Sequence, residues 1–222
     1  MRKRRRLRTV LLVVALAAIV GGGGAVALQQ WDQNSKSDGG TGTSSASGSP
    51  SPSGSPTGSA HGTLPANWQA YDDPWGFTVY LPKGWTRRVV GIDGDLRQVD
   101  YTPDNEKHFL RIAIDTSPDF TNAYDHQKNL EQQLKHRFAD FKTVRMEENT
   151  YRDRPGSLWD ATWTAPANGT KFPGPWRAIE ETYFSPEGTE YAIYMASPAD
   201  DWAKTSKQFK SVLQGWQEKT TQ

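Results

Sequence analysis

A tract of small and polar residues divides this 222-residue chain and decides which part of it can fold. Residues 32–63 are almost entirely Ser, Gly, Thr and Pro with scattered polar groups. A segment of this composition buries too little apolar surface to offset the conformational entropy that folding removes. We therefore expect a flexible tether at residues 29–63 and a single folded domain at residues 64–222.

The N-terminal segment has the pattern of a membrane anchor. Six basic residues lie within residues 1–8, and an apolar run follows at residues 9–28. A helix of about twenty residues is about 30 Å long, which matches the core of a bilayer. Because basic flanks stay in the cytoplasm, we predict a cytoplasmic tail at 1–8, a single-pass anchor in the cell membrane at 9–28 and an extracytoplasmic domain. The alternative is a signal peptide with small residues at 25–27, which exports the domain in the same direction.

The charge and cysteine content of the domain exclude several classes of protein. From Leu64 onward, 19 Lys and Arg face 23 Asp and Glu, a net charge of −4. A nucleic-acid surface needs clustered basic residues, so we expect no nucleic-acid partner. The chain has no Cys, which excludes disulfides and a cysteine-linked lipid anchor.

Alternating apolar side chains predict strands along the domain. Phe77, Val79 and Leu81 alternate with Thr78 and Tyr80, the period of a half-buried strand. Further strands are predicted at residues 86–92, 96–101, 109–115, 142–150, 157–164, 176–184 and 190–196. Apolar residues on both faces of 109–115 predict a strand that is covered on both sides.

Two helices complete the predicted fold. Asn122 has the spacing of an N-cap for a helix that ends near Phe138, and Ser197 with Asp200 has the spacing of a second capping box. Long antiparallel runs with two amphipathic helices favour the α+β class. We predict an antiparallel sheet of about seven strands with amphipathic helices on its faces.

One stretch of the domain resembles a known family. Residues 71–85 read aromatic-x-Asp-Pro-x-Gly-Phe-x-Val-x-Leu-Pro-Lys-Gly-Trp. This pattern resembles the start of an extracytoplasmic domain of actinobacterial membrane proteins, found at the outer end of some membrane Ser/Thr kinases and in stand-alone anchored proteins. Residues 191–202 are similar to that family's closing strand and helix. The resemblance implies a PsbP-like α/β/α sandwich and a sensing or binding role, and it carries over no catalytic residue.

The residues themselves do not assemble a catalytic or metal site. The kinase motifs and the Gly-x-Ser-x-Gly elbow of serine hydrolases do not occur in the sequence. The three domain histidines, His108, His126 and His136, lack the spacing of metal ligands, so we expect no metal and no cofactor. The acidic pairs 147–148 and 180–181 each point to opposite faces of a strand, and we expect them to be solvated.

Aromatic and basic residues near turns are the candidate binding residues. The connection 165–175 is the longest expected between elements, and long loops are often functional. It presents Lys171 and Phe172 ahead of Trp176, while Trp75 lies in a Pro-Trp-Gly turn. We predict that these four residues contribute to ligand binding.

Two functions remain open from the sequence. The first is a membrane-anchored, non-catalytic, extracytoplasmic domain that senses or binds a wall-associated ligand or a protein partner. The alternative is an accessory or scaffold subunit that docks to another membrane or cell-envelope protein. A large concave apolar pocket would favour the first function, and a flat exposed patch would favour the second.

Overall fold

The computed structural model describes residues 65–138, 140–168 and 170–219. The predicted tail at 1–8, anchor at 9–28 and tether at 29–63 lie outside the described residues. Within the described residues, no helix has the length and apolar character needed to cross a membrane.

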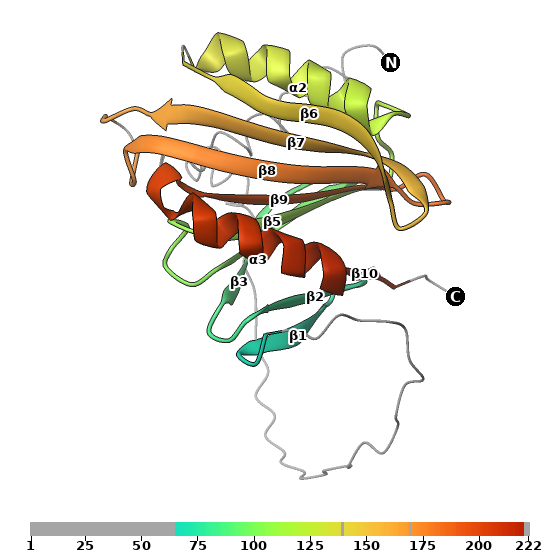
Figure 1. Cartoon of the computed structure of the whole chain (residues 1–222). Helices are drawn as coiled ribbons and strands as arrows, with labels where there is room; N and C mark the ends of the chain where they lie inside the picture. The colour runs from blue at the N-terminus through green and yellow to red at the C-terminus, as the bar shows by residue number, and fades with distance from the viewer. Residues whose placement is uncertain (1–64, 139, 169, 220–222) are drawn as a thin grey trace, which may run out of the picture.

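A seven-stranded antiparallel sheet forms the middle layer of the domain, in the order β3-β4-β5-β9-β8-β7-β6 (Figure 1). This arrangement confirms the predicted fold class. All seven residues of β5 are buried, as predicted for a strand covered on both faces. The strands of this sheet are β3 Thr86–Asp93, β4 Leu96–Thr102, β5 Phe109–Asp115, β6 Lys142–Tyr151, β7 Arg154–Ala165, β8 Gly174–Phe184 and β9 Glu190–Pro198.

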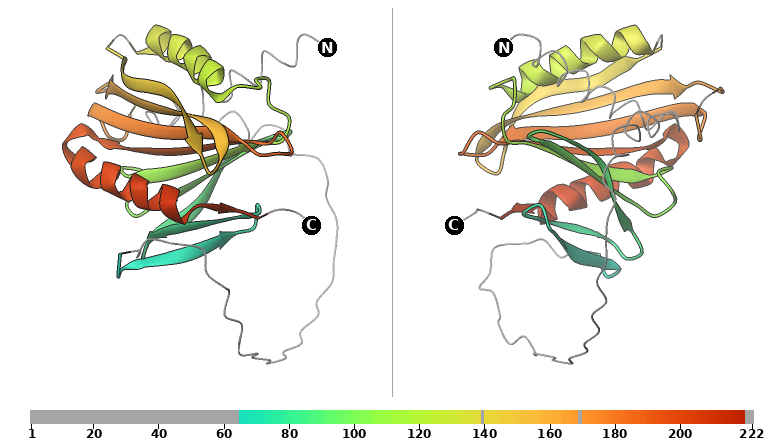
Figure 2. Two further views of the ribbon diagram at one scale, coloured as in Figure 1. Left: turned by 45° about the vertical axis from the view of Figure 1, so that its right-hand side comes forward. Right: turned by 180° about the vertical axis from the view of Figure 1, so that it is seen from behind.

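One helix covers each face of this sheet (Figures 1 and 2). Helix α2, Ala123–Arg137, lies over β6, β7 and β8, and the Asn122 side chain caps it by accepting from the backbone N–H of Asp125. Helix α3, Trp202–Gly215, packs on the opposite face against β9 and β8.

The predicted capping box at the start of α3 is wrong. A 3-10 turn, η2 (Ala199–Asp201), precedes α3, and no side chain caps either element. Ser197 instead accepts a hydrogen bond from Thr205 Oγ1 at 2.8 Å, inside the first turn of the helix. The reason is that η2 comes directly before α3: Asp201, at the N-cap position of α3, has φ −92° and ψ 2° and so lacks the extended backbone that a capping residue requires.

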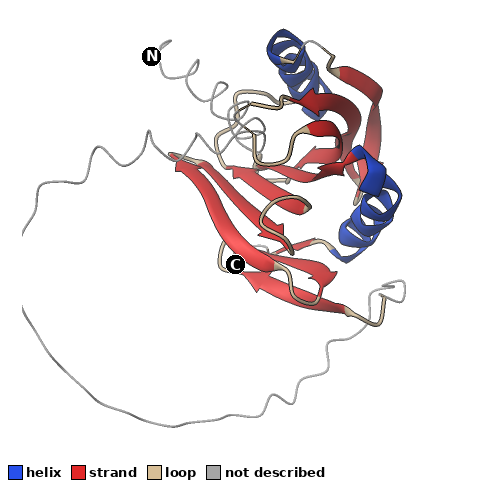
Figure 3. Cartoon of the chain, turned by 90° about the vertical axis from the view of Figure 1, so that its left-hand side faces the viewer, coloured by secondary structure: helices blue, strands red, loops and turns tan. Residues whose placement is uncertain are grey.

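The first predicted strand lies in a second, smaller sheet with order β1-β2-β10 (Figure 3). It comprises β1 Trp68–Asp73, β2 Phe77–Pro82 and β10 Gln217–Glu218. The sequence did not predict β1 or β10. Both pair with β2, which lies between them, so the first and last strands of the described domain belong to the same small sheet.

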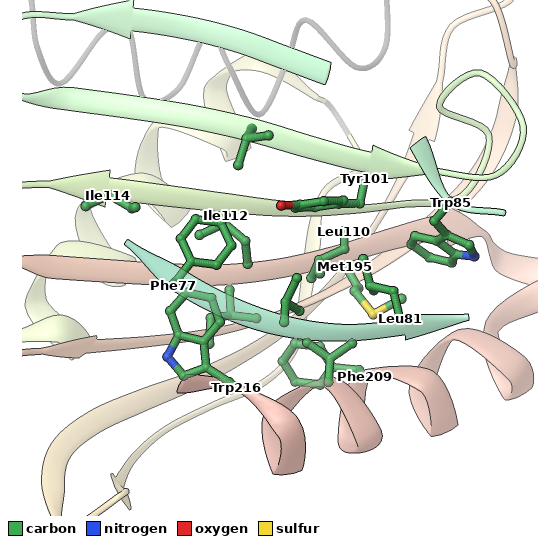
Figure 4. Packing of buried hydrophobic residues seen from close by; sticks show 14 of the residues in the cluster. Phe77, Leu81, Trp85, Tyr101, Leu110, Ile112, Ile114, Met195, Phe209 and Trp216 are labelled. Carbon is green, nitrogen blue, oxygen red and sulfur yellow. The ribbon is translucent and has the colours of Figure 1, made fainter. Parts of the chain in front are cut away.

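Two clusters of buried apolar residues occupy the two sides of the seven-stranded sheet. The first core cluster lies between the sheet, β2 and α3, and Phe77, Leu81, Phe209 and Trp216 belong to it (Figure 4). The second core cluster lies under α2. It contains Phe109, Leu130, Leu134, Phe141, Trp159, Ala161, Trp163, Ala165, Trp176, Ala178, Tyr194 and Ala196.

Candidate functional site

The structure does not bring the four predicted binding residues together. Trp75 packs at the border of the first core cluster, whereas Phe172 packs against the second, on the other side of the sheet. Lys171 is exposed, and its Nζ donates to the backbone carbonyl of Asn105 at 3.2 Å. Trp176, which we expected at the surface, is only 2% exposed. The reason is that β8 begins at Gly174 and places Trp176 inside the sheet, where its indole N–H donates to the Phe172 carbonyl at 2.9 Å.

The Asp-Pro-x-Gly part of the sequence motif is residues 73–76, and its aspartate, Asp73, has a structural role. Its buried carboxylate accepts from Arg87 Nε at 2.6 Å, from the Tyr101 hydroxyl at 2.5 Å and from the Trp75 backbone N–H at 2.8 Å. Burial acts to raise the pKa of Asp73, but the hydrogen bonds from Arg87, Tyr101 and Trp75 outweigh it and lower the pKa. The carboxylate therefore fastens the turn between β1 and β2 to strands β3 and β4.

This network positions Trp75 beside the edge of the large sheet. The Arg87 guanidinium lies 4.8 Å from the centre of the Trp75 ring, a cation–π contact. Arg87, Val89 and Ile92 pair with Tyr101, Val99 and Arg97 of β4, so they share the sheet face that carries the first core cluster. We call Trp75, Arg87, Val89 and Ile92 the β3 surface.

The β3 surface is unusual because its aliphatic side chains are exposed. Among the described residues, the exposed large hydrophobic side chains are Val89 at 45%, Ile92 at 61% and Val144 at 52%. Val89 and Ile92 lie on β3 and Val144 lies on β6, the two edge strands of the seven-stranded sheet. An edge strand also presents backbone N–H and C=O groups that can pair with another chain. The surface could therefore accept an added strand whose side chains contact the two aliphatic residues.

Two small cavities under α2 are the other candidate site. The larger measures about 30 Å³ and is lined by Phe138, Trp159, Trp163, Tyr194 and other apolar residues, with Glu180 at one side. The second measures about 20 Å³, lies beside His126 and Glu190, and shares Glu180 with the first. Ligand pockets generally measure roughly 300–1,000 Å³. Each cavity is too small for a ligand larger than a few atoms.

The carboxylates of Glu180 and Glu181 are buried, which contradicts the expectation that they are solvated. They do point to opposite sides of the sheet: Glu180 accepts from Gln127 and Thr182 under α2, and Glu181 accepts from Asn149 on the other side. Burial raises the pKa of both side chains, that of Glu181 to about 7. Two buried carboxyl groups separated by a sheet cannot act on one glycosidic bond.

Two of the three domain histidines, His126 and His108, hold elements together, and His136 is exposed on α2. His126 Nδ1 lies 2.6 Å from Glu190 Oε1 and stacks on Phe120, which joins α2 to β9. His108 lies between Asp104 and Asp201, 2.6 Å and 3.0 Å from their carboxylates. Across the described ranges, no group of three or more His, Cys, Asp or Glu is arranged to hold a metal ion.

Comparisons with solved structures identify the fold. The solution structure of the cyanobacterial PsbP protein from Synechocystis sp. PCC 6803 matches with a TM-score of 0.52 and 14% identity, over 72% of this chain and 98% of that chain. This likeness shows a PsbP-like fold. The Ran-binding protein Mog1p of Saccharomyces cerevisiae matches with a TM-score of 0.48 and 8% identity, over 70% of this chain and 96% of the other.

LpqN of Mycobacterium tuberculosis, described as involved in cell envelope biogenesis, matches more loosely. Its TM-score is 0.35 at 8% identity, over 69% of this chain and 79% of that one. The matches to Mog1p and LpqN are too loose to support an argument about function. No curated protein sequence matches the chain. A family model described as the serine/threonine kinase C-terminal domain matches residues 69–218.

Proposed function

The chain belongs to the family of serine/threonine kinase C-terminal domains, and we propose that it is a membrane-anchored, non-catalytic protein that docks a protein partner outside the membrane. The membership concerns residues 69–218, and the 222-residue sequence contains no kinase catalytic motif. The chain is therefore proposed to contribute binding and not phosphoryl transfer.

The distribution of exposed apolar side chains carries this proposal. Val89, Ile92 and Val144 are the large hydrophobic residues exposed in the described part of the chain, and all three lie on edge strands. The cavities, by contrast, hold about 30 Å³ and 20 Å³. This combination favours the alternative that the sequence left open, an accessory or scaffold role, over capture of a small wall-derived ligand.

Strand addition at β3 is the proposed mode of docking. A partner strand beside β3 gains main-chain hydrogen bonds, and the side chains on the β3 surface give specificity. Val89 and Ile92 supply apolar contact, and Trp75 lies on the same face beside Arg87. The Asp73 network holds Arg87 and Trp75 in place, so little ordering is needed when a partner binds.

The location outside the membrane rests on the sequence. Six basic residues precede the apolar run at 9–28, which favours a cytoplasmic N-terminus and an exported domain. A tether at 29–63 would let the domain reach about 30 Å from the anchor on average. Partners within this range include other membrane proteins and components of the cell envelope.

A photo-crosslinking amino acid at position 92 tests the proposal in intact cells that express the full chain. We expect an adduct with another polypeptide when the probe replaces Ile92, and none when it replaces Lys207 on the exposed side of α3. Val89→Asp should abolish the adduct at position 92 because it places a charge in the apolar contact. A folded protein that gives no adduct at position 92 contradicts docking at β3.

A further inference from the structure

A β-bulge in β3 gives this edge strand an unusual order of side chains. Val89 pairs with Val99 and Gly91 pairs with Gln98, so Val90 is an extra residue in the strand. Residues three apart in a regular strand point to opposite faces. Because of the bulge, Val89 and Ile92 point to the same face of the sheet. Their cross-strand partners on β4 are Val99 and Arg97.

The bulge has the same effect on the charged residues. Arg88 pairs with Asp100 and Asp93 pairs with Leu96, so both lie on the face opposite to Val89 and Ile92. The residues from 88 to 93 are Arg, Val, Val, Gly, Ile and Asp. A cation and an anion stand at the two ends, an aliphatic residue follows each of them inward, and Val90 and Gly91 lie in the centre. This order is complementary to itself when the strand is reversed.

We propose that β3 pairs antiparallel with β3 of a second copy of this chain, around a two-fold axis between Val90 and Gly91. The inference rests on the proposed docking at the β3 surface and identifies the partner. In this register Arg88 lies opposite Asp93 of the second copy, and Val89 lies opposite its Ile92. Each contact occurs twice, as an isologous interface requires.

The faces of the strand select this register. A shift by one residue would place Arg88 opposite Ile92 of the other copy, and these two side chains point to different faces of the sheet. A shift by two residues keeps the faces matched but sets Arg87 opposite Ile92. Only the proposed register combines opposite charges on one face with aliphatic pairs on the other.

The available groups fit this interface. Arg88 is exposed, and its guanidinium pairs with Glu106 of the β4–β5 connection. Gly91 at the axis adds no side chain that would hinder the approach of Val90 from the other copy. A bulge normally discourages indiscriminate edge pairing, and here the two copies bring identical bulges to the same point.

Cysteine cross-linking in the native membrane tests the proposal, because the chain has no Cys of its own. Across the axis, Val90 of one copy lies diagonally opposite Val90 of the other, at a Cα separation of about 6 Å that a disulfide can span. The full-length Val90→Cys variant should form a disulfide-linked dimer upon mild oxidation. Val144→Cys is the matched control, because Val144 is likewise the extra residue of a bulge on an edge strand, β6, and is more exposed than Val90.

Charge reversal distinguishes cross-linking at a specific interface from cross-linking by chance collision. In the Val90→Cys background, Arg88→Asp should lower the dimer yield roughly tenfold, because it opposes two pairs of like charges. The double change Arg88→Asp with Asp93→Arg should restore the yield. It does not restore the ion pair of Arg88 with Glu106 within one chain, so recovery reports the contact between copies.

Each outcome decides a different point. Dimers from Val90→Cys with little from Val144→Cys, and recovery upon double reversal, support the self-pairing. Equal yields from both positions, or no recovery, overturn it. A position-92 adduct with a different protein would leave docking at β3 in place and remove self-pairing, whereas no adduct of any kind removes both.

Discussion

The Asn149 Nδ2 group donates to Glu181 Oε2 at 2.9 Å, while Asn149 Oδ1 and Glu181 Oε1 have no hydrogen-bond partner within the described residues. Both of these oxygens lie near Gly156, because a Cβ added to that glycine would be 2.8 Å from each. These two hydrogen-bond acceptors therefore face the same small space without a donor between them. A proton on the Glu181 carboxyl group supplies that donor.

The first prediction concerns this proton. Burial raises the pKa of Glu181 from 4.5 to about 7, so the native state holds the proton more tightly than the unfolded state. Stability should therefore fall as pH rises between about 4.5 and 7, by on the order of 1–3 kcal/mol. Glu181→Gln should remove this dependence, since an amide donates to Asn149 without titrating. Denaturant unfolding at pH 5 and pH 8 measures the change in the free energy of unfolding with pH. An equal change in the wild-type protein and in the Glu181→Gln variant would refute the assignment.

His126 gives a second pH-dependent contribution. Burial acts to lower the pKa of His126, but the hydrogen bond to Glu190 and the negative charges of Glu190, Glu180 and Asp115 together outweigh burial and raise the pKa above 6.5. The stabilisation is therefore complete below about pH 6.5 and is lost as pH rises through the higher native pKa. Glu190→Gln should flatten this part of the stability profile. The NMR titration of the His126 ring checks it directly, and a midpoint below 6.5 would contradict the prediction.

The third prediction concerns the turn at Asp73. Asp73→Asn should lower the free energy of unfolding by about 2 kcal/mol, because the buried Tyr101 hydroxyl and the half-exposed Arg87 lose a charged acceptor. The neighbouring Asp72→Asn is the control, since Asp72 is exposed and should change stability by about 0.5 kcal/mol or less. Tryptophan fluorescence in a urea titration measures both. Equal effects would mean that the network contributes little.

Gly215 offers a test of packing at the end of α3. A Cβ at this position would lie 2.7 Å from Cδ2 and 2.9 Å from Cβ of Tyr80. Gly215→Ala should therefore destabilise the domain by about 1–3 kcal/mol even though alanine favours helices. Gln214→Ala, one residue earlier and exposed, should be nearly neutral. A more stable Gly215→Ala variant would show that Tyr80 moves aside without cost.

The last prediction concerns Lys171. Its ammonium group holds the β4–β5 connection through Asn105, and Glu106 of that connection pairs with Arg88 on β3. Lys171→Ala should leave the melting temperature almost unchanged, because exposed substitutions cost about 0.5 kcal/mol or less. It should reduce the adduct formed at position 92. Phe172→Ala, by comparison, removes packing from the second core cluster and should lower stability. An unchanged adduct would exclude Lys171 from the docking site.

Local patterns predicted most of the fold. Period-two alternation located β2 and the seven strands of the large sheet, and the Asn122 cap located the start of α2. Strand β1 was missed because half of its sequence, WQAYDD, is polar. Its strand conformation depends on its pairing with β2. Strand β10 has two residues, too few for any period to be visible.

The candidate site was harder to predict because it depends on contacts between distant segments. The burial of Glu180 and Glu181 follows from partners on α2 and β6, which the sequence of β8 alone does not show. The exposure of Val89 and Ile92 follows from the edge position of β3, a property of topology. One signal was available: Val89 and Ile92 break the strict alternation of a strand, which is the mark of a bulge.

The pairing of β1 with β2 also determines how the domain bears mechanical load. Trp68, the first residue of β1, lies opposite Pro82, and β3 begins only a few residues later at Thr86. If β3 is held by a partner while the chain is pulled from its N-terminal side, the force enters at Trp68 and leaves near Thr86. The hairpin would then open from its free end, one residue pair after another, and a modest pull would detach β1 while the seven-stranded sheet stays intact.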